Sequence, residues 1–264
     1  MPDTPHSAPR PAGVLVTLDD RTVLVTGGSR GIGRAISLLL ARAGARVALQ
    51  YRERENEARQ VVEMIRSEGG TALALRSEIS DETQVLRMVA RIGSELGPAT
   101  ILVNNAGIWE GRAVDEMTLA EWERTFAINM RSMFLCARAV IPHMKRAGSG
   151  RIVNIASTAG QRGEAFHSDY AATKGAAIAF TRSLATELAP HGIRVNCVAP
   201  GWVDTEMCAG VFASGGREAI ERTIPLGRVG SPAEIAGAVL FAASDLASFM
   251  TGAIVSVNGG AVMA

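Results

Sequence analysis

A tyrosine and a lysine, Tyr170 and Lys174, stand four positions apart in a segment of helical period, 168–189. A helix places residues at this spacing on one face, so both side chains can reach a common point. A phenol with its ordinary pKa of about 10 is a poor base near neutrality, but a nearby cation stabilises the phenolate. The spacing therefore predicts a proton-transfer pair in which Lys174 lowers the pKa of Tyr170.

A serine, Ser157, follows the apolar run 150–156. Its neutral hydroxyl can donate a hydrogen bond to a substrate carbonyl while negative charge develops on the carbonyl oxygen. In isolation, a Tyr–Lys pair more often belongs to a core or to a solvated helix face. A serine at the end of a strand makes catalysis the stronger interpretation, because parallel sheets present their chemistry at the carboxyl ends of strands.

A glycine-rich turn follows the first apolar run and contains Gly27, Gly31 and Gly33. Glycines at these positions let the backbone turn tightly, approach a pyrophosphate and pack the next helix closely. The amino terminus of that helix offers free N–H groups and the positive end of its dipole. Since a strand precedes the turn and a helix and a second strand follow it, the pattern predicts a dinucleotide-binding unit.

The second apolar run, 46–51, ends in Tyr51 and Arg52 rather than in an acidic residue. An acidic residue there would hold the ribose hydroxyls of NAD. Arg30, inside the glycine turn, and Arg52 could instead pair with a 2′-phosphate, because guanidinium binds phosphate in a bidentate manner. The alternative is that both are solvated surface arginines. We expect NADP(H) to be favoured over NAD(H).

These residues need a scaffold, and the alternation of apolar runs with amphipathic segments predicts one. Such alternation is typical of an α/β Rossmann fold, a doubly wound parallel sheet of about seven strands with helices on both faces. Strands are expected at 21–26, 46–51, 71–76, 100–104, 150–156, 193–198 and 253–257, and helices at 31–43, 53–68, 81–96, 118–147, 168–189 and 231–243.

The domain organisation follows from the same pattern. Residues 1–17 are expected to form a flexible N-terminal tail, and residues 18–264 a single catalytic domain. The segment 205–224 has weaker periodicity and is interpreted as a mobile lid.

Composition excludes several classes of protein. The chain has 264 residues, with Lys+Arg 27 against Asp+Glu 26, so no global charge favours nucleic acid or an anionic membrane. No run approaches the ~18 apolar residues that a membrane-spanning helix needs, and the proline-rich start does not resemble a signal peptide. Cys136, Cys197 and Cys208 lack metal-ligand spacing, so we expect no metal and a reducing, cytoplasmic location.

Taken in order along the chain, the motifs resemble those of the short-chain dehydrogenase/reductase family over essentially all of residues 18–264. The motifs are Thr26–Gly33, Asn104–Gly107, Asn129, Ser157, Tyr170–Lys174, Pro200–Gly201 with Thr205, and Val257–Gly260. The resemblance implies that Tyr170 is the general acid/base and that Ser157 positions the carbonyl. It also implies that Lys174 holds the nicotinamide ribose and that Asn129 anchors a proton-relay water.

The glycine turn, the arginines and the resemblance together predict which residues contact the cofactor. These residues are Gly27, Ser29, Arg30, Gly31, Ile32, Gly33, Tyr51, Arg52, Glu78, Ile79, Asn105, Ala106, Gly107, Tyr170, Lys174, Pro200, Gly201, Val203 and Thr205. Members of the family usually carry Asp against adenine after the third strand. This chain has the longer Glu78 there, so its contact with adenine stays open.

Within the family, the stretch 224–234 and the length are most similar to 3-oxoacyl-[acyl-carrier-protein] reductases. Polyol and sugar dehydrogenases look similar and are the alternative, and a non-catalytic dinucleotide-binding regulator is an alternative of another class. An acidic carrier protein would need exposed basic residues near the site. The candidates are Lys145, Arg146 and Arg194.

The loop between Ser157 and Tyr170 should border the substrate. We expect Gln161 and Glu164 to contact it, and their polarity would also suit a hydroxylated small molecule. Trp109, Trp202 and Met207 could form an apolar wall, although ordinary packing explains them equally well. The resemblance further implies a homotetramer with interfaces through 118–147, 168–189 and the carboxyl-terminal segment.

Overall fold

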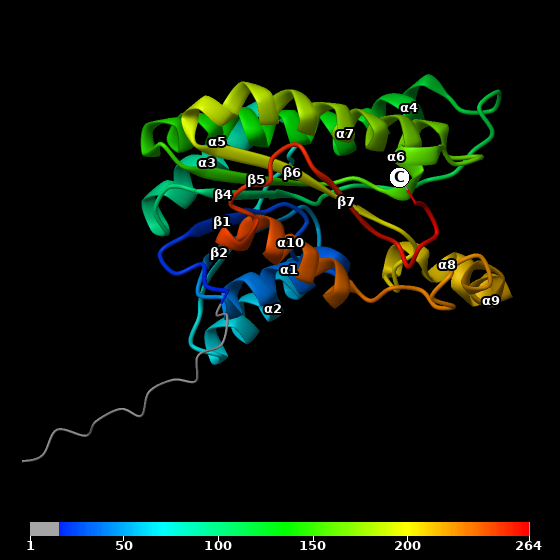
Figure 1. Cartoon of the computed structure of the whole chain (residues 1–264), viewed down its shortest axis with the longest axis horizontal. Coiled ribbons are helices and arrows are strands. Elements are labelled where there is room, and N and C mark those ends of the chain that lie inside the picture. The colour runs from blue at the N-terminus through cyan, green and yellow to red at the C-terminus, as the bar shows by residue number, and fades with distance from the viewer. Residues whose placement is uncertain (1–15, 264) are drawn as a thin grey trace, which may run out of the picture.

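One parallel sheet of seven strands organises the computed structural model, which describes residues 16–263 (Figure 1). The predicted tail, 1–17, lies outside the described residues except for its last two positions. The strands are β1 (Thr22–Val25), β2 (Arg46–Tyr51), β3 (Thr71–Arg76), β4 (Ile101–Asn104), β5 (Gly150–Ile155), β6 (Ile193–Pro200) and β7 (Ile254–Val257). The predicted strands at 46–51 and 71–76 coincide with β2 and β3, and the others differ by one or two residues at their ends.

The strand order is β3-β2-β1-β4-β5-β6-β7, which creates a switch point beside β1. The chain runs outward from β1 to β3 and then returns to pair β4 on the other side of β1. Connections leave β1 and β4 in opposite directions, so a crevice opens between their carboxyl ends.

Helices cover both faces of the sheet (Figure 1). One face carries α1 (Gly31–Arg42), α2 (Glu55–Ser67) and α10 (Pro232–Ala243), and the other carries α3 (Glu82–Glu95), α5 (Ser132–Ala147) and α7 (Ser168–Leu188). Alternate residues of a strand point to opposite faces. Accordingly Val23 and Val25 belong to the core under α1, whereas Leu24 between them belongs to the core under α3.

The prediction of one continuous helix over 118–147 is wrong, because the structure divides this segment into three parts. It contains α4 (Leu119–Phe126), a π-helical turn, η1 (Ala127–Arg131), and then α5. The Ser132 N–H donates to the Ala127 carbonyl, five residues back, which is the π pattern. A register change of one residue leaves the apolar periodicity on either side intact, so the sequence pattern does not reveal it.

Short helices surround the carboxyl ends of the strands. They are α6 (Thr158–Arg162), η3 (Glu206–Cys208), α8 (Ala209–Val211), η4 (Phe212–Gly216) and α9 (Arg217–Glu221); two further turns, η2 (Ala189–His191) and η5 (Asp245–Ala247), follow α7 and α10. Figure 1 shows α8 and α9 projecting beyond the sheet opposite α6. The segment predicted as a lid, 205–224, therefore consists of short helical turns, and its mobility stays a prediction.

Within residues 16–263, no helix combines the length and the apolar character needed to cross a membrane.

Candidate functional site

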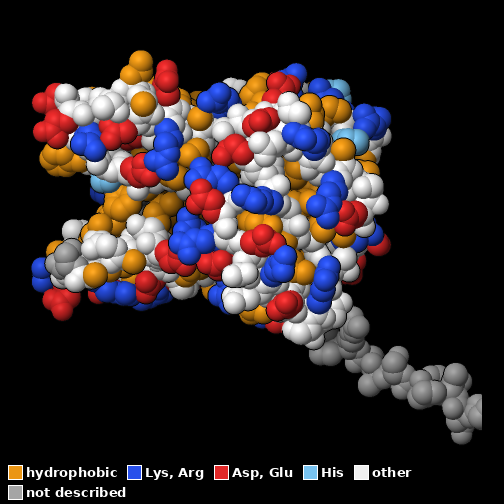
Figure 2. Space-filling model, turned by 180° about the vertical axis from the view of Figure 1, so that it is seen from behind, with side chains coloured by type: hydrophobic (Ala, Val, Ile, Leu, Met, Phe, Trp, Pro, Cys, Tyr) orange, Lys and Arg blue, Asp and Glu red, His pale blue; other side chains and the backbone are white. Residues whose placement is uncertain are grey.

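A cavity of about 600 Å³ lies at the carboxyl ends of the central strands. Figure 2 shows the surface hollowed between two projecting parts of the molecule, with hydrophobic side chains exposed in the opening. Every predicted site residue lines this cavity except Asn129 and Gln161. Residues from Gly27 to Cys208 thus meet in one place, although many sequence positions separate them.

The glycine turn is shaped to receive a pyrophosphate. A Cβ on Gly33 would lie 2.0 Å from the Gly27 carbonyl oxygen, and Gly27 itself has a left-handed φ of 63°. The turn is held in place by Gln50, whose Oε1 accepts from the Gly27 N–H at 2.9 Å. No side chain caps the amino terminus of α1 and its first turn has no acidic residue, so its N–H groups are available to an anion.

Thr26 and Ser77 belong to this region, although they were not among the expected cofactor contacts. Thr26 Oγ1 accepts from the N–H groups of Asn105 and Ala106, each at 3.0 Å, and so joins the glycine turn to the loop after β4. Ser77 lines the cavity after β3, and its buried hydroxyl has no hydrogen-bond partner among the described residues. Both are polar residues at strand ends, which is the signal that could have identified them.

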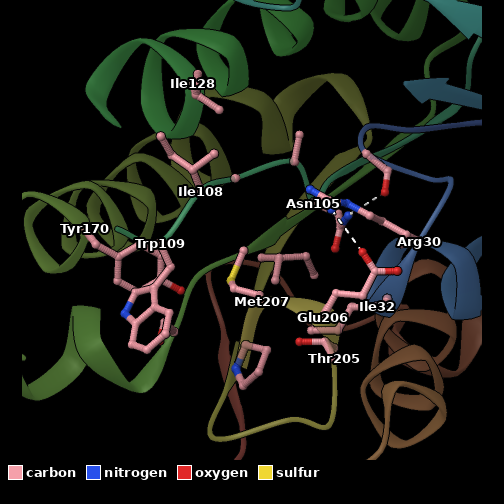
Figure 3. A pocket seen from close by; sticks show the side chains of 18 of the residues that line it. Arg30, Ile32, Asn105, Ile108, Trp109, Ile128, Tyr170, Thr205, Glu206 and Met207 are labelled. Carbon is pink, nitrogen blue, oxygen red and sulfur yellow. Dashed lines mark hydrogen bonds and ion pairs between the residues drawn. The ribbon is translucent and has the colours of Figure 1, made fainter. Parts of the chain in front are cut away.

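The two arginines expected at a 2′-phosphate are already paired with carboxylates. Arg30 Nη1 lies 3.1 Å from Glu206 Oε2, as Figure 3 shows. Arg52 donates to Glu53, with Nε at 3.0 Å, and its Nη1 lies 3.6 Å from Glu78 Oε2. Both guanidiniums are about half exposed. A phosphate would therefore have to compete with carboxylates that the sequence interpretation did not associate with these arginines.

The catalytic candidates meet at the other end of the cavity. Tyr170 and Lys174 lie one turn apart on α7, with Lys174 Nζ 5.6 Å from the centre of the Tyr170 ring. Lys174 is buried, and its Nζ donates to the Ile155 carbonyl at 2.8 Å. Burial lowers the pKa of Lys174 to about 8. Ser157 precedes α6, and its Oγ accepts from the Ala159 N–H at 3.1 Å.

The pKa of Tyr170 differs from the sequence-based prediction. Burial raises it, a hydrogen bond from Ser157 acts in the opposite direction, and electrostatic interactions with Glu164 and Cys208 raise it further. Lys174 Nζ is bonded to the Ile155 carbonyl and lies 5.6 Å from the centre of the Tyr170 ring. The raised pKa is opposite to the predicted direction, and the effect of Lys174 on it stays a prediction.

Asn129 lies behind the cavity wall rather than in it. Its Oδ1 accepts from the Ile108 N–H at 2.8 Å, and its Nδ2 donates to the Ile108 carbonyl at 3.0 Å and to Thr173 Oγ1 at 3.1 Å. The side chain therefore holds the loop after β4 against α7. Its predicted role in anchoring a water stays a prediction.

Gln161 lies outside the cavity. It was expected to contact the substrate, but it does not line the cavity, and its Nε2 donates to Ser256 Oγ of β7 at 3.0 Å. The short helix α6 causes this, because one helical turn rotates Gln161 away from the side that Ser157 and Thr158 present to the cavity.

Aromatic rings form the wall of the substrate end. The rings of Trp109 and His167 stack with centroids 4.4 Å apart and an interplanar angle of 6°, and Trp202 meets Trp109 edge-on at 5.7 Å. Figure 3 shows Trp109 and Tyr170 together at one end, with Met207 between them and Arg30. The expected apolar wall of Trp109, Trp202 and Met207 thus lines the cavity, and His167 was missed as its support.

The basic residues proposed for a carrier protein lie elsewhere. Lys145 and Arg146 end α5 immediately before β5 begins, so they lie at the amino ends of the strands, away from the cavity. Arg194 is half-buried and donates to the carbonyls of Ala242, Ser244 and Ala247. The expectation that these residues lie near the site is wrong, because strand direction places them at the opposite edge.

The cavity fits a nicotinamide dinucleotide. A glycine cradle that a Cβ would fill and free helix N–H groups suit the pyrophosphate, and the unpartnered Ser77 hydroxyl suits an adenine. At the far end, hydroxyl and ammonium groups converge where a carbonyl would be reduced. No cluster of three or more metal-ligating side chains occurs in the part of the chain that the structure describes.

Comparisons with known proteins agree with this geometry. The family described as enoyl-(acyl carrier protein) reductase matches residues 27–262. A 3-oxoacyl-[acyl-carrier-protein] reductase of Synechocystis is 38% identical over 250 residues, 94% of this chain and 100% of that one. An uncharacterised oxidoreductase of Escherichia coli is 42% identical over 242 residues, 90% of this chain and 98% of that one.

Among solved structures, a gluconate 5-dehydrogenase from Burkholderia cenocepacia, in complex with NADP and tartrate, is similar with a TM-score of 0.88. It is 32% identical in sequence, and the match covers 93% of this chain and 96% of that one.

Proposed function

The chain belongs to the short-chain dehydrogenase/reductase family of oxidoreductases, and from that premise we propose that it interconverts a carbonyl and a secondary alcohol with NADP(H). Its function is most like that of the 3-oxoacyl-[acyl-carrier-protein] reductases. The observation that carries the proposal is the meeting of Ser157, Tyr170 and Lys174 at one end of a cavity whose other end is a dinucleotide turn.

The side chains support carbonyl reduction. The bound nicotinamide would supply the hydride to the carbonyl carbon. Ser157 donates a hydrogen bond to the carbonyl oxygen, and the Tyr170 phenol gives that oxygen a proton as its negative charge develops. Burial raises the pKa of Tyr170, which favours the neutral phenol. The neutral phenol is the form that can donate a proton to the oxygen during carbonyl reduction.

The preference for NADP(H) is part of the proposal. Its support is the pair Arg30 and Arg52 at one end of the cavity, the lack of an acidic residue at the end of β2, and a solved relative with NADP. Comparing kcat/KM for NADPH and NADH on one carbonyl substrate tests it. A higher value with NADH would refute the preference.

A panel of 3-oxoacyl thioesters and polyols tests the substrate class. Turnover of 3-oxoacyl thioesters with NADPH is expected, and robust oxidation of polyols without any thioester reduction would favour the second candidate, a polyol or sugar dehydrogenase. One observation supports that candidate: the carboxylate of Glu164 at the substrate end suits hydroxyl groups. The third alternative, a regulator without turnover, predicts cofactor binding but no activity on any carbonyl.

The assembly and location are also proposals. Large apolar side chains exposed on α5 and around α10 support a homotetramer: Phe134 is 44% exposed, Phe241 is 40% exposed, and Phe249 is fully exposed. Light scattering of the purified chain tests this, and a monomer would refute it. Three free cysteines suit the cytoplasm. We also propose that residues 18–264 form one catalytic domain.

A further inference from the structure

One carboxylate in the cavity has no hydrogen-bonded partner among the described residues. Glu164 lines the substrate end, and its side chain is 24% exposed. Its ion-pair partner would be the imidazole of His167, but His167 Nδ1 lies 3.8 Å from Glu164 Oε1, too far for a hydrogen bond. That nitrogen lies 3.1 Å from the Ala165 carbonyl oxygen. Among the side chains that the structure describes, no hydrogen bond and no other ion pair reaches the Glu164 carboxylate.

Each of the remaining carboxylates of the cavity has an arginine partner. They form ion pairs with arginines, as follows: Glu53 and Glu78 with Arg52, Glu110 with Arg124, and Glu206 with Arg30. A partly buried carboxylate without a donor loses hydration and gains nothing in return. Glu164 is therefore the acceptor in the cavity that a ligand would satisfy.

Glu164 lies close to the reacting groups. It lines the same cavity as Tyr170 and Cys208, and its loop leads directly into α7, which carries Tyr170. Tyr170 is where a substrate carbonyl would receive its proton. A substrate bound at Tyr170 can therefore contact Glu164 with a second group.

The loop that carries Glu164 is fixed in place. His167 stacks on Trp109, and the Arg112 N–H donates to the Phe166 carbonyl at 2.6 Å, so this loop is docked on the loop after β4. Phe166 is held at a left-handed φ of 63°, which a bulky residue adopts only when its surroundings impose it. The carboxylate is thus positioned before a ligand arrives.

We propose that Glu164 binds a hydrogen-bond donor, a hydroxyl or an amide N–H, near the reacting carbonyl of the substrate, and that it excludes substrates with an anionic group there. The inference rests on the proposed function, carbonyl reduction at Tyr170. A carboxylate binds neutral donors strongly and repels a second anion. Two sources supply a donor: the hydroxyls of a sugar-like ketone and the amide of a cysteamine thioester arm.

The test uses the full chain with saturating NADPH and four ketones. The N-acetylcysteamine thioester of 3-oxobutanoate carries an amide donor, a neutral ketose carries hydroxyls, ethyl 3-oxobutanoate carries no donor, and a keto aldonate is anionic. The variants are Glu164→Leu, which removes the acceptor, and Glu164→Gln, which removes the charge. Glu123→Leu, at an exposed position of α4 outside the cavity, is the matched control.

Glu164→Leu should lower kcat/KM for a donor-bearing substrate by about ten- to a hundredfold, mainly through KM, and leave the ethyl ester within about twofold. A loss confined to the thioester identifies the amide as the donor, and a loss confined to the ketose identifies the hydroxyls. Glu164→Gln should raise kcat/KM for the aldonate by about fivefold or more. Glu123→Leu should change none of these values.

Equal losses on donor-bearing and donor-free ketones would overturn the inference, because they indicate a structural role for Glu164. Unchanged values for all four ketones would overturn it as well. A wild-type chain that reduces none of the four would refute the proposed function, and the inference with it. If the wild-type chain reduces these ketones and the Glu164 substitutions change kcat/KM equally for all of them, the inference alone is refuted.

Discussion

Removing the guanidinium of Arg30 should weaken NADPH binding and leave NADH binding nearly unchanged. A charge-assisted bond between arginine and phosphate contributes about 1.5–3 kcal/mol. Arg30 must first leave Glu206, 3.1 Å away, but both side chains are more than half exposed. Such an exposed pair contributes only about 0–1 kcal/mol. The net contribution of Arg30 is therefore about 1–2 kcal/mol.

This free energy corresponds to about five- to thirtyfold in Kd, since about 1.4 kcal/mol is a factor of ten. Titration of Arg30→Ala with NADPH and with NADH, followed by cofactor fluorescence, measures it. Glu206→Gln should tighten NADPH binding by up to about fivefold, because the competing carboxylate loses its charge.

Arg34→Ala is the matched control. Arg34 lies one turn further along α1, is exposed and does not line the cavity, so it removes the same charge without touching the site. The reasoning is refuted if Arg30→Ala weakens NADPH and NADH equally, or if Arg34→Ala has the same effect as Arg30→Ala.

Three further predictions concern single residues of the site. Tyr170→Phe should lower kcat by about 10²–10⁴-fold while the Kd of NADPH stays within about twofold, because only the proton donor is lost; retained turnover in a steady-state assay would exclude this role. Gly33→Ala should abolish cofactor binding in the same titration, because its Cβ would lie 2.0 Å from the Gly27 carbonyl oxygen, and normal affinity would show that the turn can shift. Lys174→Met should raise the free energy of unfolding at pH 7, because burial lowers the pKa of Lys174 to about 8 from 10.5. Between pH 8 and pH 10.5, the unfolded chain binds more protons than the folded chain. The buried charge therefore costs on the order of 3 kcal/mol of stability below pH 8, and this cost disappears as the pH rises toward 10.5. Chemical denaturation of both proteins at pH 7 and pH 10 checks this, and a difference that does not shrink at the higher pH contradicts it.

The elements whose signals are local were predicted well. Strands β2 and β3 begin and end where the apolar runs indicated, because both faces of a covered parallel sheet demand continuous apolar residues. The glycine turn was equally clear, since only glycine fits its close approach to the backbone. The π-turn η1 and the short helix α6 were missed, because each depends on packing against α7 or the cavity and not on periodicity.

The amino-acid sequence by itself indicated most of the cofactor-binding and catalytic groups that line the cavity, because motif order and the parallel topology together bring strand ends to one edge. Only the tertiary structure decided how these groups are paired. Arg30 meets Glu206 across 176 positions of chain, and no local pattern connects them. The same holds for proton affinities: the pKa values of Tyr170 and Lys174 depend on desolvation and on distances between charges, which exist only once the chain is folded.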